Sequence, residues 1–300
     1  MLRAAMTQTV NAYEGMPARV QDLGRLKGHL SAVRDANLEH HAGLLREARK
    51  RGARAVCLGE LFPAPYFALG KDPMWRGLAE DALKGPSVAA MRRAASDLGL
   101  VVVAPIYELD ARNGRRYNTA VVIEQDGRVL GKYRKAHIPC GTNEQGSFNE
   151  TFYYGRSDGG RATKALYPVF KTSVGRVGVS ICYDRHFSGV AAALAAAGAQ
   201  LVFSPAVTFG EKSRRMWELE FLVDAARHRL FIGGSNRLGA ERPWNQRYFG
   251  AGYFAGPDGQ KLPELSDHPN LVLADLDLGA LGRPDPSGWN LALDARPLKS

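Results

Sequence analysis

Strand-like and helix-like segments alternate along the whole chain, and this alternation limits the folds that it can adopt. In the early part, an amphipathic helix predicted over 32–51 lies between strands at 2–8 and 54–59. Further helices are predicted over 87–98, 189–197 and 213–229, and further strands over 100–108, 117–125, 128–133, 169–172, 176–182, 200–204 and 231–236. Repeated strand–helix–strand units place helices on the faces of a partly parallel sheet.

Short turn sequences also predict antiparallel hairpins. Asp126-Gly127 lies between two of these strands and is a strong hairpin signal. Val174-Gly175 separates a second pair, and a last hairpin is predicted between 250–255 and 271–275, with its turn at 257–259. Hairpins mixed with strand–helix–strand units imply a mixed sheet covered by helices, so we expect an α/β fold built in layers.

The sequence contains no internal repeat, no low-complexity segment and no linker, so we expect a single domain over residues 1–300. The segment 282–300 has little periodicity and is predicted to be a tail, which crosses a neighbouring subunit or lies on its own domain. The polar stretch 139–158 is long and rich in glycine and aromatic residues. A loop of this length in a compact domain is usually functional or mobile.

Basic residues exceed acidic ones, with 40 Lys and Arg against 30 Asp and Glu and a formal net charge of +10. This charge could serve nucleic-acid binding, but the basic residues are scattered, and no basic–aromatic motif of a nucleic-acid module is visible. We therefore expect a solvated basic surface that can favour anionic small substrates, and no nucleic-acid partner. A non-catalytic nucleic-acid-binding protein is the least favoured alternative.

The sequence indicates neither membrane insertion nor secretion. No stretch of about 18 apolar residues is present, and residues 1–10 lack the charged-then-apolar pattern of a signal peptide. Cys57, Cys140 and Cys182 are too widely spaced for a disulfide framework or a metal-ligand cluster. We therefore expect a cytoplasmic protein with no membrane partner and no bound metal.

Cys182 follows a strand whose alternating residues Val177, Val179 and Ile181 lead to it, and it precedes the alanine-rich helix at 189–197. Ser188 is a candidate N-cap for that helix. A thiol at this place can meet the positive end of the helix dipole, which would lower its pKa and favour the reactive thiolate. The alternative from the residues alone is a buried structural cysteine.

Three strand ends place chemically useful groups just before loops. The strand at 54–59 is followed by Glu60, the strand at 128–133 by Lys135 after one further residue, and the third ends at Cys182. A thiol can attack a carbonyl carbon, a carboxylate can take its proton, and a fixed cation can stabilise the resulting oxyanion. Singly, each signal is weak, because a Glu after a strand is often a rim residue and a Lys is often solvated.

Taken together, these segments resemble the nitrilase superfamily of carbon-nitrogen hydrolases, whose members carry a Glu-Lys-Cys triad in this chain order. The resemblance runs from about residue 2 to 277 and rests on four ordered motifs. They are Gly-Glu-Leu-Phe (59–62), Tyr-Arg-Lys-Ala-His-Ile-Pro (133–139), Phe-Asn-Glu-Thr-Phe-Tyr-Tyr (148–154) and Ser-Ile-Cys-Tyr-Asp-Arg-His-Phe (180–187).

The resemblance implies a four-layer α-β-β-α sandwich, subunits that pair as a homodimer or higher homo-oligomer, and no metal or organic cofactor. It further implies that Cys182 is the nucleophile and Glu60 the general base and later the acid. Lys135 and the backbone N–H of Tyr183 would form the oxyanion hole. Glu150 would orient Lys135 and the substrate nitrogen.

Within the superfamily, the segment around Cys182 is most similar to the β-ureidopropionase branch, which hydrolyses carbamoyl amides. Nitrilases typically have Trp after the nucleophile, where this chain has Tyr183. We therefore expect hydrolysis of an N-carbamoyl-β-amino acid or another N-carbamoyl amino acid, with release of ammonia and CO2. Carbamoylputrescine or another aliphatic ω-amide is the alternative substrate, and a nitrile is less favoured.

A carboxylate-bearing substrate would suit Arg185, whose guanidinium can bind a carboxylate with two parallel hydrogen bonds. Arg185 could instead pair with Asp184 or Glu218 and brace the turn. His186 could assist with the carboxylate or cap the next helix.

Phe62, Tyr66 and Phe148 are candidate pocket walls, although aromatic residues are more often simply packed in a core. The loop 140–147 is longer than expected for β-ureidopropionases and resembles that of N-carbamoyl-D-amino acid hydrolases and carbamoylputrescine amidases. Because this loop should border the pocket, the identity of the substrate stays open.

Overall fold

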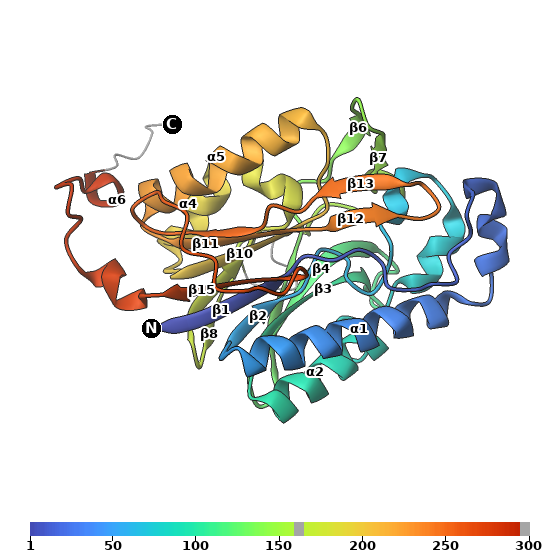
Figure 1. Cartoon of the computed structure of the whole chain (residues 1–300), viewed down its shortest axis with the longest axis horizontal. Helices are drawn as coiled ribbons and strands as arrows, with labels where there is room; N and C mark the ends of the chain where they lie inside the picture. The colour runs from blue at the N-terminus through green and yellow to red at the C-terminus, as the bar shows by residue number, and fades with distance from the viewer. Residues whose placement is uncertain (159–164, 295–300) are drawn as a thin grey trace.

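Two mixed β-sheets lie face to face, and helices cover the outer face of each sheet (Figure 1). The computed structural model describes residues 1–158 and 165–294. The order of the layers is helix, sheet, sheet, helix, so the predicted four-layer α-β-β-α sandwich is confirmed.

The first sheet has six strands in the order β15-β1-β2-β3-β4-β5. They are β1 (Leu2–Thr7), β2 (Ala55–Cys57), β3 (Val101–Leu109), β4 (Arg116–Ile123), β5 (Val129–Arg134) and β15 (Leu271–Leu276). β1, β2 and β3 are parallel, and β4 is antiparallel to both of its neighbours. β5 therefore runs in the same direction as β2, and the two strands end at the same edge of the sheet.

The second sheet has five strands in the order β14-β11-β10-β9-β8. They are β8 (Val169–Thr172), β9 (Gly175–Val179), β10 (Leu201–Ala206), β11 (Phe231–Asn236) and β14 (Tyr253–Ala255). The three central strands β9, β10 and β11 are parallel, so their carboxyl ends meet at one edge. In doubly covered parallel sheets, this edge is where ligands usually bind.

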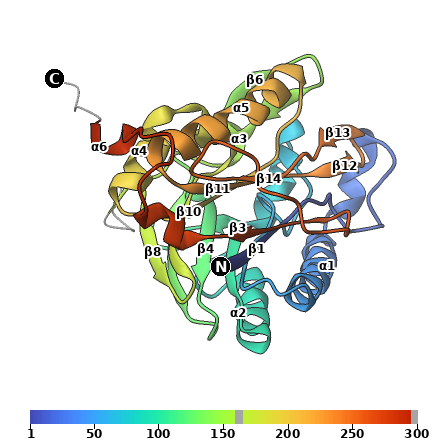
Figure 2. The same cartoon turned by 60° about the vertical axis from the view of Figure 1, so that its left-hand side comes forward.

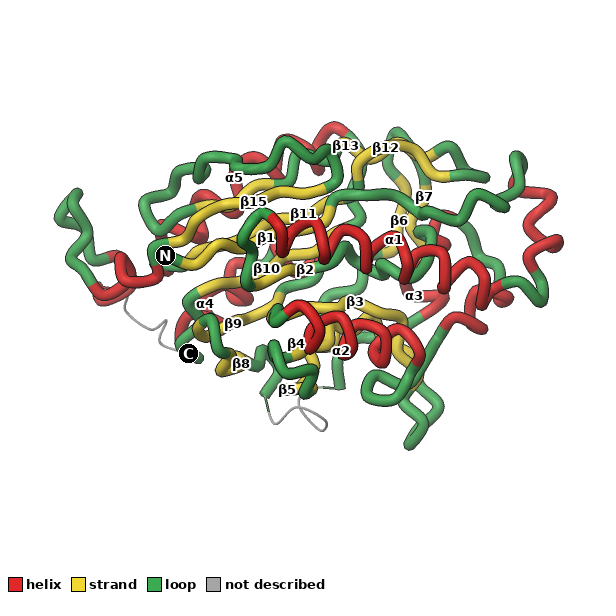
Figure 3. The backbone as a smooth tube through the Cα atoms, turned by 60° about the horizontal axis from the view of Figure 1, so that its bottom comes forward, coloured by secondary structure: helices red, strands yellow, loops and turns green. Residues whose placement is uncertain are grey.

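Four long helices form the outer layers. They are α1 (Leu30–Lys50) and α2 (Pro86–Leu98) on the first sheet, and α4 (Ser188–Ala196) and α5 (Glu211–His228) on the second. Figure 2 shows these two helix layers on opposite sides of the strands, and Figure 3 shows α1 and α2 lying across the first sheet.

The strands of the first sheet are buried on both faces. In β3, Val101 and Val103 belong to the apolar cluster that fills the space between the sheets, whereas Val102 belongs to the cluster beneath α1 and α2. Because successive side chains of a strand point to opposite faces, a strand packed on both sides must be apolar throughout. The apolar run 101–106 of β3 follows from this double packing.

Several short elements lie at the edge where the parallel strands end. The stretch 139–158, expected to be a long loop, instead contains the hairpin of β6 (Cys140–Thr142) and β7 (Ser147–Asn149) and the short helix α3 (Glu150–Tyr153). A second hairpin, β12 (Leu238–Glu241) and β13 (Gln246–Phe249), was not expected. The remaining elements are η1 (Val20–Leu26), η2 (Phe67–Leu69), η3 (Pro73–Leu78), η4 (Cys182–His186), η5 (Leu278–Gly282) and α6 (Leu291–Asp294).

The last predicted hairpin is wrong, because its two strands belong to different sheets. β14 pairs antiparallel with β11 in the second sheet, and β15 pairs antiparallel with β1 in the first. The predicted turn does form, since the N–H of Gly259 donates to the carbonyl of Gly256. After this turn, a single antiparallel bridge forms between Ala255 and Lys261. The following residues lead to β15 in the first sheet.

None of the helices in residues 1–158 and 165–294 combines the length and apolar character that crossing a bilayer requires. The predicted tail at 282–300 lies partly outside the described residues. Its described part includes α6, which lies near α5.

Candidate active site

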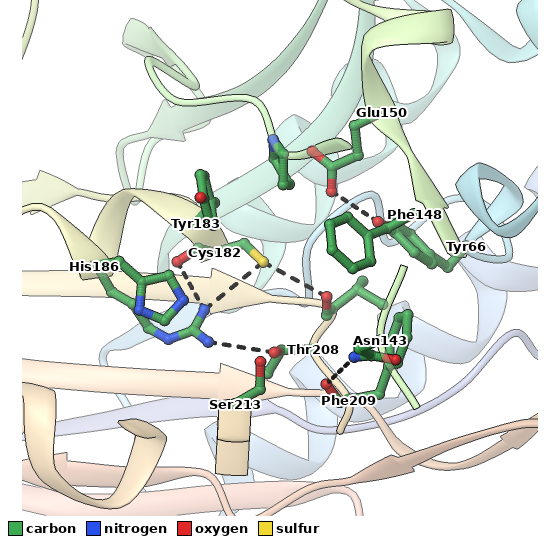
Figure 4. Close-up of a pocket in the computed structure, with 13 residues that line it drawn as sticks. Tyr66, Asn143, Phe148, Glu150, Cys182, Tyr183, His186, Thr208, Phe209 and Ser213 are labelled. Atoms are coloured by element: carbon green, nitrogen blue, oxygen red, sulfur yellow. Dashed lines mark hydrogen bonds between the residues drawn. The ribbon is translucent and has the colours of Figure 1, made fainter. Parts of the chain in front are cut away.

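The residues of the four motifs come together at the edge where β2, β5 and β9 end. Glu60 follows β2, Lys135 follows β5 directly, Cys182 follows β9, and Glu150 is the first residue of α3. All four side chains are buried. Figure 4 shows the sulfur of Cys182 and the carboxylate of Glu150 facing the same pocket.

Lys135 links the two carboxylates. Its Nζ lies 2.8 Å from Oε1 of Glu60 and 2.7 Å from Oε2 of Glu150. Burial alone would lower the pKa of Lys135, but the attraction of Glu150 and Glu60 outweighs this effect and raises the pKa. Lys135 is therefore held as a cation at neutral pH.

Glu60 is held by two further donors. Nδ2 of Asn118, in the middle of β4, donates to Oε1 of Glu60 at 2.7 Å. The backbone N–H of Val207, directly after β10, donates to Oε2 at 2.6 Å. The carbonyl of the same Val207 accepts from Sγ of Cys182 at 3.5 Å. The backbone of Val207 therefore contacts both the carboxylate of Glu60 and the thiol of Cys182.

Glu150 accepts from the hydroxyl of Tyr66 at 2.8 Å as well as from Lys135. Burial raises the pKa of Glu150, Lys135 lowers it, and the nearby negative charge of Glu60 raises it again, with a net upward shift. Burial also raises the pKa of Tyr66 far above its usual range, so its hydroxyl remains a proton donor.

Cys182 is the first residue of η4 and has a positive φ of 51°. Non-glycine residues rarely adopt this conformation, which turns the chain sharply between β9 and η4 and directs the thiol into the pocket. Burial, followed by the charge of Glu60, raises the pKa of Cys182 to about 12, against the opposing effects of Lys135 and Arg185.

The expected lowering of the thiol pKa by a helix dipole is therefore wrong. Cys182 heads the five-residue η4 rather than α4, and desolvation together with Glu60 outweighs any favourable dipole. Ser188 is also not an N-cap, because it is the first residue of α4 and the preceding Phe187 makes no side-chain capping bond. The resting group is a thiol that must transfer its proton during attack.

Asp184 fastens the η4 turn to the segment that carries Lys135. Its Oδ2 accepts from the hydroxyl of Tyr133 at 2.6 Å and from the N–H of Ile181 at 2.9 Å. Its Oδ1 accepts from the N–H of His137 at 3.0 Å. Since Tyr133 and His137 flank Lys135, Asp184 fixes the thiol relative to the ammonium group.

Arg185 lines the pocket and is almost completely buried. Its Nη1 donates to the carbonyl of Cys182 at 2.9 Å, and its Nη2 donates to Oγ1 of Thr208 at 3.3 Å. The expected alternative partners were wrong, because Asp184 makes the contacts described above and Glu218 pairs with Arg214. Arg185 instead has its Nε 3.2 Å from Oε2 of Glu220, without hydrogen-bond alignment.

His186 and Tyr183 also line the pocket. Nδ1 of His186 lies 2.6 Å from Oε1 of Glu220, so the same carboxylate contacts both Arg185 and His186. The side chain of Tyr183 is 36% exposed. As the second residue of η4, Tyr183 belongs to the first turn, where backbone N–H groups have no acceptor within the helix.

Two of the three predicted aromatic walls, Tyr66 and Phe148, line the pocket. Phe62 does not, and its assignment to the substrate site must be corrected. Its ring packs 5.0 Å from that of His41 in the core beneath α1 and α2. The positive φ of 52° at Leu61 turns the chain immediately before it.

The pocket encloses about 430 Å³ of space that no atom occupies. It is lined by Tyr66, Pro139, Asn143, Phe148, Glu150, Cys182, Tyr183, Arg185, His186, Val207, Thr208, Phe209 and Ser213. A wider outer groove adjoins it and shares five of these residues, and it adds the charged side chains of Glu144, Lys212 and Glu220. Within the described ranges, no group of three or more His, Cys, Asp or Glu residues is arranged to hold a metal ion.

The sequence reasoning missed four residues that hold the site. Asn118 and Val207 contact Glu60, Asp184 fixes the turn, and Arg237 donates to the carbonyls of Glu60 and Ala64. Arg237 also pairs with Glu241. For Asn118 and Arg237, a signal was available in the occurrence of a polar residue within or directly after a strongly apolar strand, which marks a buried polar group that needs partners.

Known proteins are similar to this chain in sequence. The sequence model of the family described as carbon-nitrogen hydrolase matches residues 27–283. A β-ureidopropionase from Arabidopsis thaliana is 33% identical over 261 residues, which are 82% of this chain and 61% of that protein. An N-carbamoylputrescine amidase from the same plant is 31% identical over 267 residues, which are 85% of each chain.

The fold is also similar to that of solved structures. A carbon-nitrogen hydrolase from Helicobacter pylori superimposes with a TM-score of 0.80 at 27% sequence identity, over 98% of this chain and 95% of the other. The two plant enzymes have nearly the same identity to this chain and act on different substrates by name, so sequence similarity alone does not select between them.

Proposed function

The chain belongs to the carbon-nitrogen hydrolase family, and from this premise we propose that it releases ammonia from the carbamoyl group of an N-carbamoyl amino acid. Membership makes it a cysteine-dependent hydrolase of C–N bonds in amides. The observation that carries the assignment of roles is the pairing of buried Lys135 with Glu60 and Glu150 beside the thiol of Cys182.

In the proposed first step, Sγ of Cys182 attacks the terminal ureido carbon while its proton passes to Glu60. Because the pKa of the thiol is raised to about 12, a nearby base is needed for this transfer at neutral pH. The negative charge that develops on the carbonyl oxygen is stabilised by Lys135 and by the first-turn N–H of Tyr183.

In the second step, the C–N bond to the amino group breaks, and Glu60 donates its proton so that ammonia leaves. The acyl group remains on Cys182 as a thioester. Water then attacks this carbon, with Glu60 as the base, and the thiol is restored. For a ureido substrate, the released N-carboxy amine loses CO2 and leaves the free amino acid.

The charge of the pocket supports a substrate that carries a carboxylate. Its lining includes the carboxylate of Glu150, already bound to Lys135, and the guanidinium of Arg185. A guanidinium has five N–H donors, so both Nη atoms of Arg185 keep donors beyond their bonds to Cys182 and Thr208. Glu220 offsets part of this positive charge, and a substrate carboxylate would compete with it.

A second candidate substrate is a carbamoyl amine such as N-carbamoylputrescine. The observation that favours it is the outer groove, whose lining includes the carboxylates of Glu144 and Glu220. Glu144 is exposed, and its Oε1 accepts from the N–H of Glu211 at the start of α5. A long cationic substrate could place its ammonium group there while its ureido group reaches Cys182.

The proposed roles are tested by ammonia release from N-carbamoyl-β-alanine, N-carbamoyl-D- and L-amino acids, N-carbamoylputrescine, a simple amide and a nitrile. We expect Cys182→Ala to lose at least about 10³-fold in kcat/KM on every accepted compound, because the nucleophile is absent. Cys140→Ala, which changes an exposed cysteine, should match the unmodified enzyme. Activity that survives in Cys182→Ala would exclude the mechanism.

Two matched variants then separate the substrate classes. Arg185→Lys should reduce kcat/KM for carbamoyl amino acids about tenfold or more, since lysine cannot form the bidentate pair. Glu144→Gln should leave kcat/KM for carbamoyl amino acids unchanged. If Glu144→Gln instead impairs N-carbamoylputrescine hydrolysis and Arg185→Lys does not affect carbamoyl amino acids, the amine is the substrate.

A further inference from the structure

Four arginines line a groove that borders α3 and shares no lining residue with the catalytic pocket. They are Arg76 on η3, Arg115 and Arg116 at the start of β4, and Arg156 after α3, and together they define the arginine groove. The groove holds about 860 Å³ of space, part of it open to solvent, and is also lined by Tyr117, Thr151, Phe152, Tyr153 and Tyr154.

The four positive charges are not balanced by carboxylates. The lining contains no Asp or Glu, and across residues 1–158 and 165–294 none of these arginines forms an ion pair. Two carboxylates in adjoining segments of the chain are already engaged, Asp110 with Arg112 and Arg134, and Asp158 with Arg134. By sequence, residues 159–164 and 295–300 contain no Asp or Glu either.

The groove lacks a hydrogen-bond acceptor for Arg116 among the described residues. Its Nε is buried and has no hydrogen-bond acceptor in the described part of the chain. Buried donors without acceptors are costly, and a charged donor is more costly than a neutral one. An anion in the groove would supply an acceptor for Arg116.

The groove is connected to the catalytic pocket through the backbone of α3. Nη2 of Arg76 donates to the carbonyl of Phe152 at 3.0 Å, and its guanidinium lies over the Phe152 ring. The N–H of Gly155, directly after α3, donates to the carbonyl of Arg116 at 3.0 Å. At its other end, the same short helix begins with Glu150, which binds Lys135.

We propose that the arginine groove binds a small, multiply charged oxyanion of the phosphate or polycarboxylate type and that its occupancy steadies α3 and hence Glu150. Guanidinium groups match the geometry of such oxyanions, because each can donate two parallel hydrogen bonds. Several arginines around one groove favour an anion of charge two or more over the single carboxylate of a carbamoyl amino acid. The site is thus separate from the substrate pocket and does not depend on which amide is hydrolysed.

The test is calorimetric titration of the full chain with inorganic pyrophosphate and with citrate, at constant ionic strength adjusted with chloride. Saturable binding of one anion per chain is expected, and the two ligands distinguish phosphate from polycarboxylate chemistry. Arg116→Gln and Arg156→Gln should each weaken binding about tenfold or more, as expected for the loss of a charge-assisted hydrogen bond. Arg49→Gln removes the same charge from an exposed position in the last turn of α1 and should change nothing.

A second readout separates the site from a general effect of charge. At the same concentration, pyrophosphate or citrate should raise the thermal midpoint of the unmodified chain and of Arg49→Gln by similar amounts, and that of Arg116→Gln by clearly less. The proposal is overturned if neither anion binds, or if Arg116→Gln and Arg156→Gln weaken binding no more than Arg49→Gln does. Because binding is measured without turnover, this outcome is independent of the assigned hydrolase activity.

Discussion

Nζ of Lys135 lies 2.8 Å from Oε1 of Glu60, and neither side chain has any exposed surface. A second carboxylate, Glu150, contacts the same ammonium group. This cluster therefore holds one cation and two acidic groups away from water, where an unbalanced negative charge is costly. Burial, together with the nearby charge of Glu60, raises the pKa of Glu150 against the opposing effect of Lys135, so Glu150 takes up a proton more readily than an exposed glutamate does.

Replacement of Lys135 by methionine should destabilise the protein by about 3 kcal/mol or more, because it leaves two buried carboxylates without a cation. The loss should be smaller at about pH 5 than at about pH 8. Burial already raises the pKa of Glu150 above its usual value, and removal of Lys135 takes away the cation that opposes this rise. The penalty is therefore absent below the unfolded pKa and grows as the pH rises toward the folded pKa.

Urea unfolding of Lys135→Met at both pH values measures this effect. Lys171→Met, which changes an exposed lysine on β8, is the control and should be close to neutral at both. An equal loss at the two pH values would mean that packing of the lysine stem, and not the charge of the two carboxylates, dominates.

The alkylation rate of Cys182 by iodoacetamide should rise about tenfold per pH unit through the neutral and mildly alkaline range. The reason is that its pKa is raised to about 12, so the reactive thiolate is a minor species throughout that range. The measurement uses a Cys57→Ser/Cys140→Ser background, in which Cys182 is the remaining cysteine of the three in the sequence.

Glu60→Gln in that background should increase the alkylation rate, because it removes a negative charge that raises the thiol pKa. Glu39→Gln, at an exposed position on α1, should have no effect. A rate that reaches its plateau near neutral pH would contradict the raised pKa and favour activation by a helix dipole.

The residues that follow strands could be found from the sequence for a physical reason. An apolar run that ends in a polar residue marks the sheet edge, and parallel strands bring their carboxyl ends together there. Glu60, Lys135 and Cys182 all follow this rule. The motifs of the resemblance added Glu150, which stands at the start of a four-residue helix that no periodicity could indicate.

Pairing between distant strands could not be found in this way. Asn118 contacts Glu60 because β4 lies antiparallel to β3 with Asn118 opposite Tyr107, and periodicity does not determine that register. The placement of β14 and β15 in different sheets also depends on pairing between residues far apart in the sequence.

Asn118→Ala should lower kcat about tenfold with little change in KM, since it removes the Nδ2 donor at 2.7 Å from Glu60 and leaves a partly unpaired buried carboxylate. The pH profile of kcat should shift as well, which a purely structural role of Asn118 would not produce. Asn113→Ala, in an exposed turn, is the control. Steady-state kinetics across pH, normalised to folded protein, provide the check, and an unchanged pH profile would count against a role for Asn118 in positioning Glu60.

Phe62→Ala should lower stability and Tyr66→Phe should lower activity, because the structure places Phe62 in the core and Tyr66 at the pocket. Phe62→Ala should cost about 3 kcal/mol or more in stability through a cavity beneath α1, with kcat/KM per folded molecule unchanged. Tyr66→Phe keeps the ring but removes the hydroxyl that donates to Glu150, so kcat/KM should fall about tenfold with little loss of stability.

Urea unfolding and ammonia release from two carbamoyl substrates, measured on both variants, separate these outcomes. The ring of Phe62 lies against His41 and does not line the pocket, so its removal should leave the preference between substrates unchanged. A change in the ratio of kcat/KM between the two substrates in Phe62→Ala would therefore restore Phe62 as a determinant of specificity. An unchanged ratio, with loss of activity confined to Tyr66→Phe, leaves Tyr66 as the aromatic residue that joins the pocket wall to the catalytic carboxylates.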